Sequence, residues 1–176
     1  MYVDNSNVFI EGKRVSAVSR GLAMNIYDAM NNRILHQSYK IDFGRLHHFI
    51  AGDDATSIKR CVLFGSRPPP NDSLWGIARR VGFEVIVEDR NVRNKEKKID
   101  TGIVAAMVKD AYTIADKTND TFTLVAGDAD YVPSVRTLAE DGFKVDVVFW
   151  DHAAKELKEA CSRFVSLDPL LNHLAY

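Results

Sequence analysis

Acidic and carboxamide side chains cluster directly after two β-rich runs of the sequence. Asp4-Asn5-Ser6-Asn7 follows a short apolar opening, and Gly127-Asp128-Ala129-Asp130 follows the run Thr121–Ala126. A further acid, Asp100, stands where a helical pattern begins. In an open α/β sheet, ligands bind beyond the carboxyl ends of the strands, at the point where the strand order reverses. If the two runs are neighbouring parallel strands, all of these side chains share one crevice.

The types of these side chains indicate a divalent cation. Carboxylates gathered in one crevice repel one another and destabilise the fold unless a positive charge neutralises them. Hard oxygen ligands suit Mg²⁺ or Mn²⁺ better than zinc, and Cys61 and Cys161 lack the spacing of a zinc site. A divalent cation lowers the pKa of a bound water and polarises a phosphoryl oxygen. The acids therefore predict a Mg²⁺ or Mn²⁺ site for phosphate chemistry.

A basic segment follows the predicted strand Phe83–Val87 and should begin on the same side of the sheet. A cationic loop beside metal-bridging acids indicates a phosphodiester substrate, whose flanking phosphates the cations would hold. The segment could instead be an ordinary solvated loop, as runs of charge usually are. Its cations are Arg90, Arg93, Lys95, Lys97 and Lys98.

Each acid also has a purely structural interpretation. An Asp between a strand and a helix is very often an N-cap, and this applies to Asp100 and Asp130. Asp4 and Asn7 flank a predicted tight turn and could be turn formers. The convergence of these side chains on one crevice favours the functional interpretation.

The elements that must position these residues alternate between β-rich runs and helical patterns. This alternation predicts a three-layer α/β/α fold with a central, mainly parallel sheet and right-handed crossovers. A strand order of about 3-2-1-4-5 places the switch point between the first and fourth strands. The predicted strands are a short opening at Val3 and the runs Ile58–Phe64, Phe83–Val87, Thr121–Ala126, Lys144–Trp150 and Phe164–Leu167. The predicted helices are Leu22–Met30, one capped by Asp42 and closed by Gly52, one capped by Asn71 or Asp72, 100–116, Val132–Asp141 and Ala153–Ala160, with mobile loops at 11–20 and 89–98.

Length and composition bound the protein class. The 176 residues, 46% hydrophobic and 27% charged, suit one globular domain over residues 1–176 and exclude disordered and fibrous classes. A net charge of -1 excludes a strongly basic nucleic-acid coat, although charge can be local. No apolar stretch approaches the roughly 20 residues of a membrane helix, and the chain opens without a signal-peptide pattern. We therefore expect a cytoplasmic, reducing location and no membrane partner.

Three motifs of the chain resemble those of the NYN domain group (LabA-like proteins), a branch of the PIN-like nuclease superfamily. They are Tyr2-Val3-Asp4-Asn5-Ser6-Asn7, Lys97-Lys98-Ile99-Asp100 and, most distinctive, Leu124-Val125-Ala126-Gly127-Asp128-Ala129-Asp130-Tyr131-Val132-Pro133. The tail from Gly142 to Leu167 also fits. The chain departs from the group's common pattern at Asn5, Ala129 and Thr101-Gly102, and none of these departures removes an acid.

The resemblance implies a ribonuclease that uses Mg²⁺ or Mn²⁺ and leaves a 5′-phosphate and a 3′-hydroxyl. By motif match, the catalytic and metal-site carboxylates would be Asp4, Asp100, Asp128 and Asp130. Asn7 would orient them or contact the metal or the phosphate, and Asn5 and the cations of the basic segment would complete the substrate-binding set. We expect RNA as the partner and endonucleolytic cleavage, because an open crevice admits an internal phosphate. A homodimer through an apolar helix face is a further expectation.

Other function classes share some of these features. A phosphatase of the haloacid dehalogenase type needs an acid/base Asp two positions after its nucleophilic Asp, where this chain has Ser6. A response-regulator receiver needs a Lys after the fifth strand, where this chain has Trp150-Asp151-His152. The main alternative is a non-catalytic RNA- or protein-binding module that holds a structural cation. Replacing one acid would distinguish this module from a nuclease.

Overall fold

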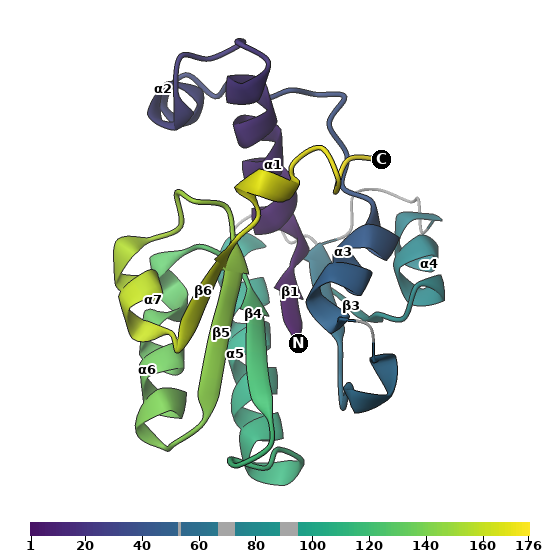
Figure 1. The fold of residues 1–176 in the computed structure, drawn as a ribbon, viewed down its shortest axis with the longest axis vertical. Helices are drawn as coiled ribbons and strands as arrows, with labels where there is room; N and C mark the ends of the chain where they lie inside the picture. The colour runs from purple at the N-terminus through teal and green to yellow at the C-terminus, as the bar shows by residue number, and fades with distance from the viewer. Residues whose placement is uncertain (53, 67–72, 89–94) are drawn as a thin grey trace.

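The protein folds around a six-stranded, all-parallel sheet in the order β3-β2-β1-β4-β5-β6 (Figure 1). The computed structural model describes residues 1–52, 54–66, 73–88 and 95–176. The predicted α/β class and the order of the first five strands are confirmed, and the sixth run adds a strand at the β5 edge. The strands are β1 (Tyr2–Asp4), β2 (Val62–Ser66), β3 (Glu84–Glu88), β4 (Thr121–Val125), β5 (Lys144–Phe149) and β6 (Arg163–Ser166).

Helices cover both faces of this sheet. They are α1 (Asn5–Ser19), α2 (Ile26–Asn31), α3 (Phe43–Ala51), α4 (Ser73–Arg80), α5 (Lys95–Thr113), α6 (Val132–Glu140) and α7 (Lys155–Ala160). Three short 3-10 turns complete the described elements: η1 (Ala55–Ser57), η2 (Ala129–Tyr131) and η3 (Asp168–Leu170). None of the helices in the described ranges has the length and hydrophobicity to cross a membrane.

Each face of the sheet has its own hydrophobic core because neighbouring strand residues point to opposite faces. Val3 and Leu63 pack with α1, α3, α4 and the C-terminal segment. Tyr2 and Val62, one position earlier in each strand, pack with α5, α6 and α7. The central strands are therefore buried on both sides, as expected for a parallel sheet between two helical layers.

Helix α1 corrects the prediction of a mobile loop at residues 11–20. The buried side of this helix is not an apolar stripe, since it includes Glu11, Gly12 and Ser16. A Cβ at Gly12 would lie 2.8 Å from Cζ2 of Trp150, so the indole packs directly on the helix backbone. The helix is thus held by close approach and polar contacts, which hydrophobic periodicity does not detect.

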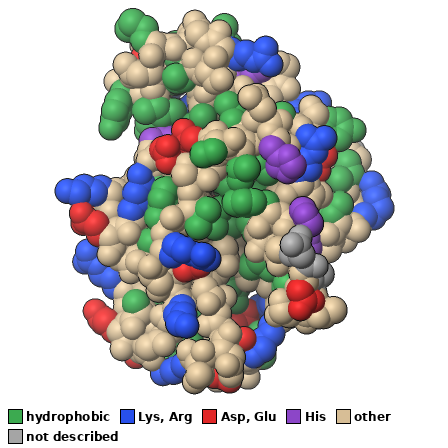
Figure 2. Space-filling view, in the orientation of Figure 1, with side chains coloured by type: hydrophobic (Ala, Val, Ile, Leu, Met, Phe, Trp, Pro, Cys, Tyr) green, Lys and Arg blue, Asp and Glu red, His purple; other side chains and the backbone are tan. Residues whose placement is uncertain are grey.

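The segment after α1 also differs from its prediction. The helix expected at Leu22–Met30 is shortened to Ile26–Asn31, because Asn25 acts as N-cap and accepts a hydrogen bond from the Asp28 backbone N–H at 3.0 Å. Met24, just before this helix, is 86% exposed. Figure 2 shows hydrophobic side chains gathered over α2 at the top of the view.

The helix expected at 100–116 begins five residues earlier, at Lys95. Asp100 therefore lies inside α5, and the prediction that it opens the helix as a cap is wrong. Two other helix predictions are confirmed. Asp42 caps α3, which ends at Gly52 with a φ of 70°, and Pro133 stands in the first turn of α6. The predicted caps Asn71 and Asp72 lie outside the described residues.

Two glycines test this packing in opposite directions. A Cβ at Gly65 in β2 would lie 2.2 Å from Cη2 of Trp75, so we expect Gly65→Ala to lower the free energy of unfolding by about 1–3 kcal/mol. At Gly102, inside α5, the nearest atom would be Phe64 Cε1 at an ordinary 3.6 Å. Gly102→Ala should therefore stabilise the protein by up to about 1 kcal/mol, through its higher helix propensity. Urea denaturation measures both, and equal effects of the two variants would contradict this packing.

Candidate active site

Asp4 ends β1 and at the same time caps α1. Its Oδ1 accepts a hydrogen bond from the Asn7 backbone N–H at 3.0 Å, and the residue is 4% exposed. The structural interpretation of this Asp as a local turn former is therefore correct, but it accounts for only one of the two carboxylate oxygens. The second oxygen, Oδ2, faces the rest of the site.

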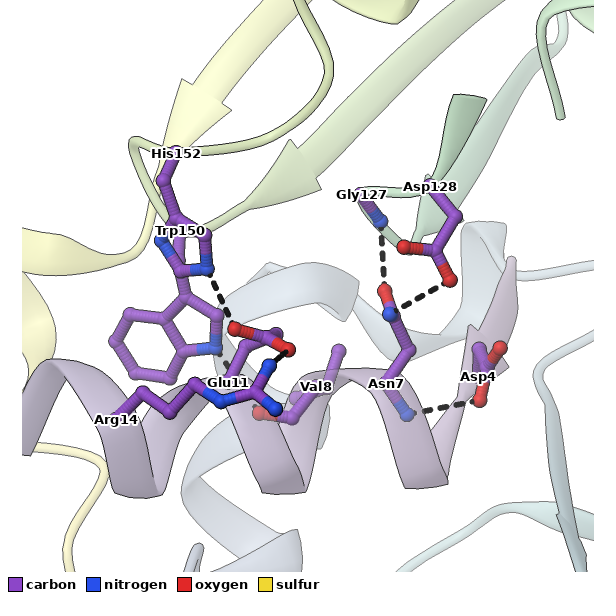
Figure 3. A network of polar contacts seen from close by, with 9 residues as sticks. All are labelled: Asp4, Asn7, Val8, Glu11, Arg14, Gly127, Asp128, Trp150 and His152. Atoms are coloured by element: carbon purple, nitrogen blue, oxygen red, sulfur yellow. Dashed lines mark hydrogen bonds and ion pairs between the residues drawn. The ribbon is translucent and has the colours of Figure 1, made fainter. Parts of the chain in front are cut away.

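Asn7 connects the first turn of α1 to the end of β4 (Figure 3). Its Oδ1 accepts a hydrogen bond from the Gly127 backbone N–H at 2.8 Å, and its Nδ2 donates to Asp128 Oδ2 at 2.9 Å. Gly127 has no space for a side chain, because a Cβ there would lie 2.1 Å from the ring of Phe149. The Asn7 carboxamide thus fixes the position of Asp128 relative to the end of β1.

Tyr131 brings a third acid to the site. Its hydroxyl lies 3.0 Å from Asp4 Oδ2 and 3.0 Å from Asp100 Oδ1, and it can donate to either carboxylate. The Tyr131 side chain is fully buried at the end of η2. Asp4 from β1, Asp100 from α5 and Asp128 after β4 therefore converge on the switch point of the sheet, as the sequence predicted.

Burial and mutual repulsion disfavour the charged forms of these acids. Burial raises the pKa of Asp4 to about 6, against the opposing hydrogen bonds from Asn7 and Tyr131, and the negative charges of Asp100 and Asp128 raise it further. Although part of Asp128 is exposed, desolvation also raises the pKa of its carboxyl, with Asn7 opposing and Asp100 adding repulsion. Burial and the two neighbouring carboxylates raise the pKa of Tyr131 strongly, so its hydroxyl remains protonated.

A second polar group lies one helical turn further along α1. The buried carboxylate of Glu11 pairs with Arg14 through Oε1 and lies 2.7 Å from His152 Nε2 through Oε2 (Figure 3). The indole Nε1 of Trp150 donates to the Val8 carbonyl at 3.0 Å. These contacts hold α1, and with it Asn7, against the segment that follows β5. The negative charge of Glu11 also contributes to the raised pKa of Asp128.

The other predicted site residues have different positions. Asp130 is exposed in η2 and adds its charge to the field at Asp128. Asn5 is half-buried at the first position of α1. Within the basic segment, Arg90 and Arg93 lie outside the described residues, and so do the side chains at the start of α5. These side chains at the start of α5 belong to Lys95, Lys97 and Lys98.

Sequence reasoning missed the roles of Tyr131, Glu11 and His152. Tyr131 stands in the third motif, where a buried aromatic residue resembles any core residue until its hydroxyl contacts are known. Glu11 falls in the segment that was predicted as a loop. A charged residue on an otherwise buried helix face is the only sequence signal that pointed to it.

The donor set of the site fits an open Mg²⁺ or Mn²⁺ site better than a closed cage. In the described part of the chain, no three His, Cys, Asp or Glu side chains are grouped closely enough to hold a metal by themselves. Mg²⁺ usually takes one or two carboxylates and completes its shell with waters and substrate phosphates. Asp4 and Asp100, which meet at one hydroxyl, with Asp128 nearby, provide oxygen donors of this kind.

Residues 5–168 match the model of the NYN domain. The chain belongs to the NYN domain family. This family is a PIN-like nuclease family. The matched range includes Asp100 and Asp128 and begins one residue after Asp4. A comparison with curated proteins gives no match.

A similar fold is found in a solved structure, that of a protein of unknown function from Vibrio parahaemolyticus RIMD 2210633. The two structures superimpose with a TM-score of 0.69 over 99% of this chain and 93% of the other. Their sequence identity is 17%, so the likeness shows a shared fold and nothing about activity.

The raised pKa of Asp4 makes the free energy of unfolding depend on pH. Between the ordinary aspartate pKa of about 3.9 and the folded-state value of about 6, the folded state binds more protons, so stability falls as the pH rises. In EDTA at pH 7, we expect Asp4→Asn to be more stable than wild type by about 1–3 kcal/mol, with the gain disappearing towards pH 4. Chemical denaturation across this pH range measures the effect.

Asp146→Asn is the matched control for this prediction. Asp146 is also buried, but its carboxylate is paired with Arg163 at 2.9 Å from Nε. Its replacement should therefore lower stability at pH 7. If Asp4→Asn destabilises the protein at pH 7 as Asp146→Asn does, Asp4 is an ordinary satisfied carboxylate.

Proposed function

We propose that this NYN domain is a metal-dependent ribonuclease that hydrolyses RNA phosphodiester bonds, endonucleolytically, with Mg²⁺ or Mn²⁺. The observation that carries the proposal is the convergence of Asp4, Asp100 and Asp128 on the switch point of the sheet. Family membership supports the reaction class, since the NYN domain is a PIN-like nuclease domain.

The electrostatics of the site support a cation and a phosphate. The described residues around the three acids add further carboxylates, Glu11 and Asp130, to the field at Asp128, so the site favours a positive charge. A phosphodiester alone would be repelled by these carboxylates. A bound divalent cation would reverse the local charge, supply an activated water and polarise a phosphoryl oxygen.

The chain's own residues have separate tasks in this proposal. Asp4 and Asp100, with Asp128 beside them, would hold the cation through one or two carboxylate oxygens, and waters and the substrate phosphate would complete its shell. Asn7 keeps Asp128 in one orientation through Oδ2, which directs the other oxygen, Oδ1, away from the carboxamide. The Asp128 carboxylate would accept a proton from the attacking water at Oδ1. In-line attack at phosphorus would break the bond to the 3′-oxygen, which would take a proton from solvent water, and would give a 5′-phosphate and a 3′-hydroxyl.

Substrate contacts belong to the same proposal. The acids lie beyond the carboxyl ends of β1 and β4, and Asp128 is exposed there, which suits an internal phosphate of a long chain. The basic segment that precedes and begins α5 would contact flanking phosphates through Arg90, Arg93, Lys95, Lys97 and Lys98. Because these contacts would be electrostatic, RNA binding should weaken as salt increases.

The proposal predicts a specific loss of activity on replacement of Asp128. Wild type should cleave labelled single-stranded or hairpin RNA with Mg²⁺ or Mn²⁺, and EDTA should abolish cleavage. Asp128→Asn should cleave RNA at least about 100-fold more slowly than wild type. It should still bind RNA, because the substitution keeps the size of the side chain and removes a repulsive charge. Glu140→Gln, at the exposed far end of α6, is the control and should match wild type.

The other outcomes separate the alternatives. Equal cleavage by wild type and Asp128→Asn would indicate a contaminating nuclease and would overturn the assignment. RNA binding without cleavage by wild type would support a non-catalytic binding module with a structural cation.

A further inference from the structure

The Tyr131 hydroxyl occupies a specific place in the acidic site. It lies at equal distances, 3.0 Å, from Asp4 Oδ2 at the end of β1 and Asp100 Oδ1 in α5. The two carboxylates come from segments almost 100 residues apart in sequence, and this hydroxyl is the group through which they meet. Their facing oxygens are therefore within two hydrogen-bond lengths of each other.

The position of this hydroxyl is set by the core and not by the acids. The Tyr131 ring is fully buried with the residues of α5 and α6. Its backbone is fixed on both sides: the N–H donates to the Asp128 carbonyl at 3.3 Å, and the carbonyl accepts from Ser134 Oγ at 2.8 Å. The Tyr131 hydroxyl is therefore held in place by contacts that are independent of Asp4 and Asp100.

The hydroxyl also limits the cost of placing two acids together. A phenol has one proton, so it can donate fully to one carboxylate at a time and partly to both. Without it, Asp4 Oδ2 and Asp100 Oδ1 would lose the hydroxyl that both contact at 3.0 Å, and repulsion between the two carboxylates would favour a larger separation.

We propose that Tyr131 is a positioning residue, whose hydroxyl holds Asp4 and Asp100 at the separation and in the orientation needed to bind one divalent cation. This inference rests on the proposed function, because it concerns the same cation site. It goes beyond the proposed function because it states that a neutral side chain, and not only the acids themselves, determines how Asp4 and Asp100 are placed.

Tyr39 provides a matched control. It is also buried, at 6% exposure, and its hydroxyl donates to the Leu171 carbonyl at 3.0 Å, in the core on the other face of the sheet. Tyr39→Phe and Tyr131→Phe each remove one buried hydroxyl and leave the ring in place. Any general effect of this change on folding is therefore common to both variants.

The experiment measures Mn²⁺ binding to the full chain by isothermal titration calorimetry without RNA, beside thermal unfolding in EDTA. Tyr131→Phe should bind Mn²⁺ about 10–100-fold more weakly than wild type, as is typical when a residue that orients metal ligands is lost. Tyr39→Phe should bind Mn²⁺ as wild type does. In cleavage assays over a range of RNA concentrations at one subsaturating Mn²⁺ concentration, Tyr131→Phe should lower kcat and leave KM for RNA nearly unchanged.

A double variant keeps the proposal testable if Tyr131→Phe has a broader effect on the fold. If Tyr131 acts through Asp100, adding Tyr131→Phe to Asp100→Asn should weaken Mn²⁺ binding little beyond Asp100→Asn alone. Fully additive losses would overturn the proposal, as would equal Mn²⁺ affinities of wild type and Tyr131→Phe.

The results also separate this inference from the proposed function. If Tyr131→Phe binds Mn²⁺ more weakly than wild type, and wild type does not cleave RNA, the positioning role is supported and the nuclease function is contradicted. Cleavage by wild type with unchanged Mn²⁺ binding by Tyr131→Phe would support the nuclease and overturn the positioning role. A wild type that binds no Mn²⁺ would overturn both.

Discussion

The parallel pairing of β1 with β4 is the contact on which the whole site depends. It aligns Tyr2 with Leu124 and Val3 with Val125, so the two strands end side by side. The strand order reverses at these two strands, which is where ligands bind in open α/β sheets. The Asn7 carboxamide then closes the junction by bonding both the backbone and the acid that follow β4.

This arrangement places charge where the fold alone would not favour it. Asp4 is buried, which raises the pKa of its carboxyl, and the charges of Asp100 and Asp128 raise it further. Partial desolvation and the charge of Asp100 raise the pKa of Asp128, although part of that residue is exposed. Two hydrophobic cores and the close packing of Trp150 on α1 stabilise the scaffold that keeps these groups together. Such a conflict between local electrostatics and overall packing is expected at functional sites.

The sequence predicted the sheet order and the meeting of Asp4 with Asp128, because apolar strands and the acids at their ends are local signals. It did not predict α1 correctly, since the buried side of that helix carries Glu11 and Gly12 in place of an apolar stripe. Asp100 lies near Asp4 as predicted, but it does not open a helix, because α5 begins five residues earlier, at Lys95. Tyr131 could not have been assigned, since its role depends on contacts between three distant segments.

The central claim is that these strand-end acids bind a divalent cation. The most direct measurement is the anomalous diffraction of a crystal of the protein soaked in Mn²⁺. The account predicts an anomalous peak at the β1–β4 junction, within about 2.5 Å of a carboxylate oxygen of Asp4, Asp100 or Asp128. An anomalous peak only at other acidic residues of the surface would contradict the cation site. So would the absence of a peak at this junction in a crystal soaked at saturating Mn²⁺.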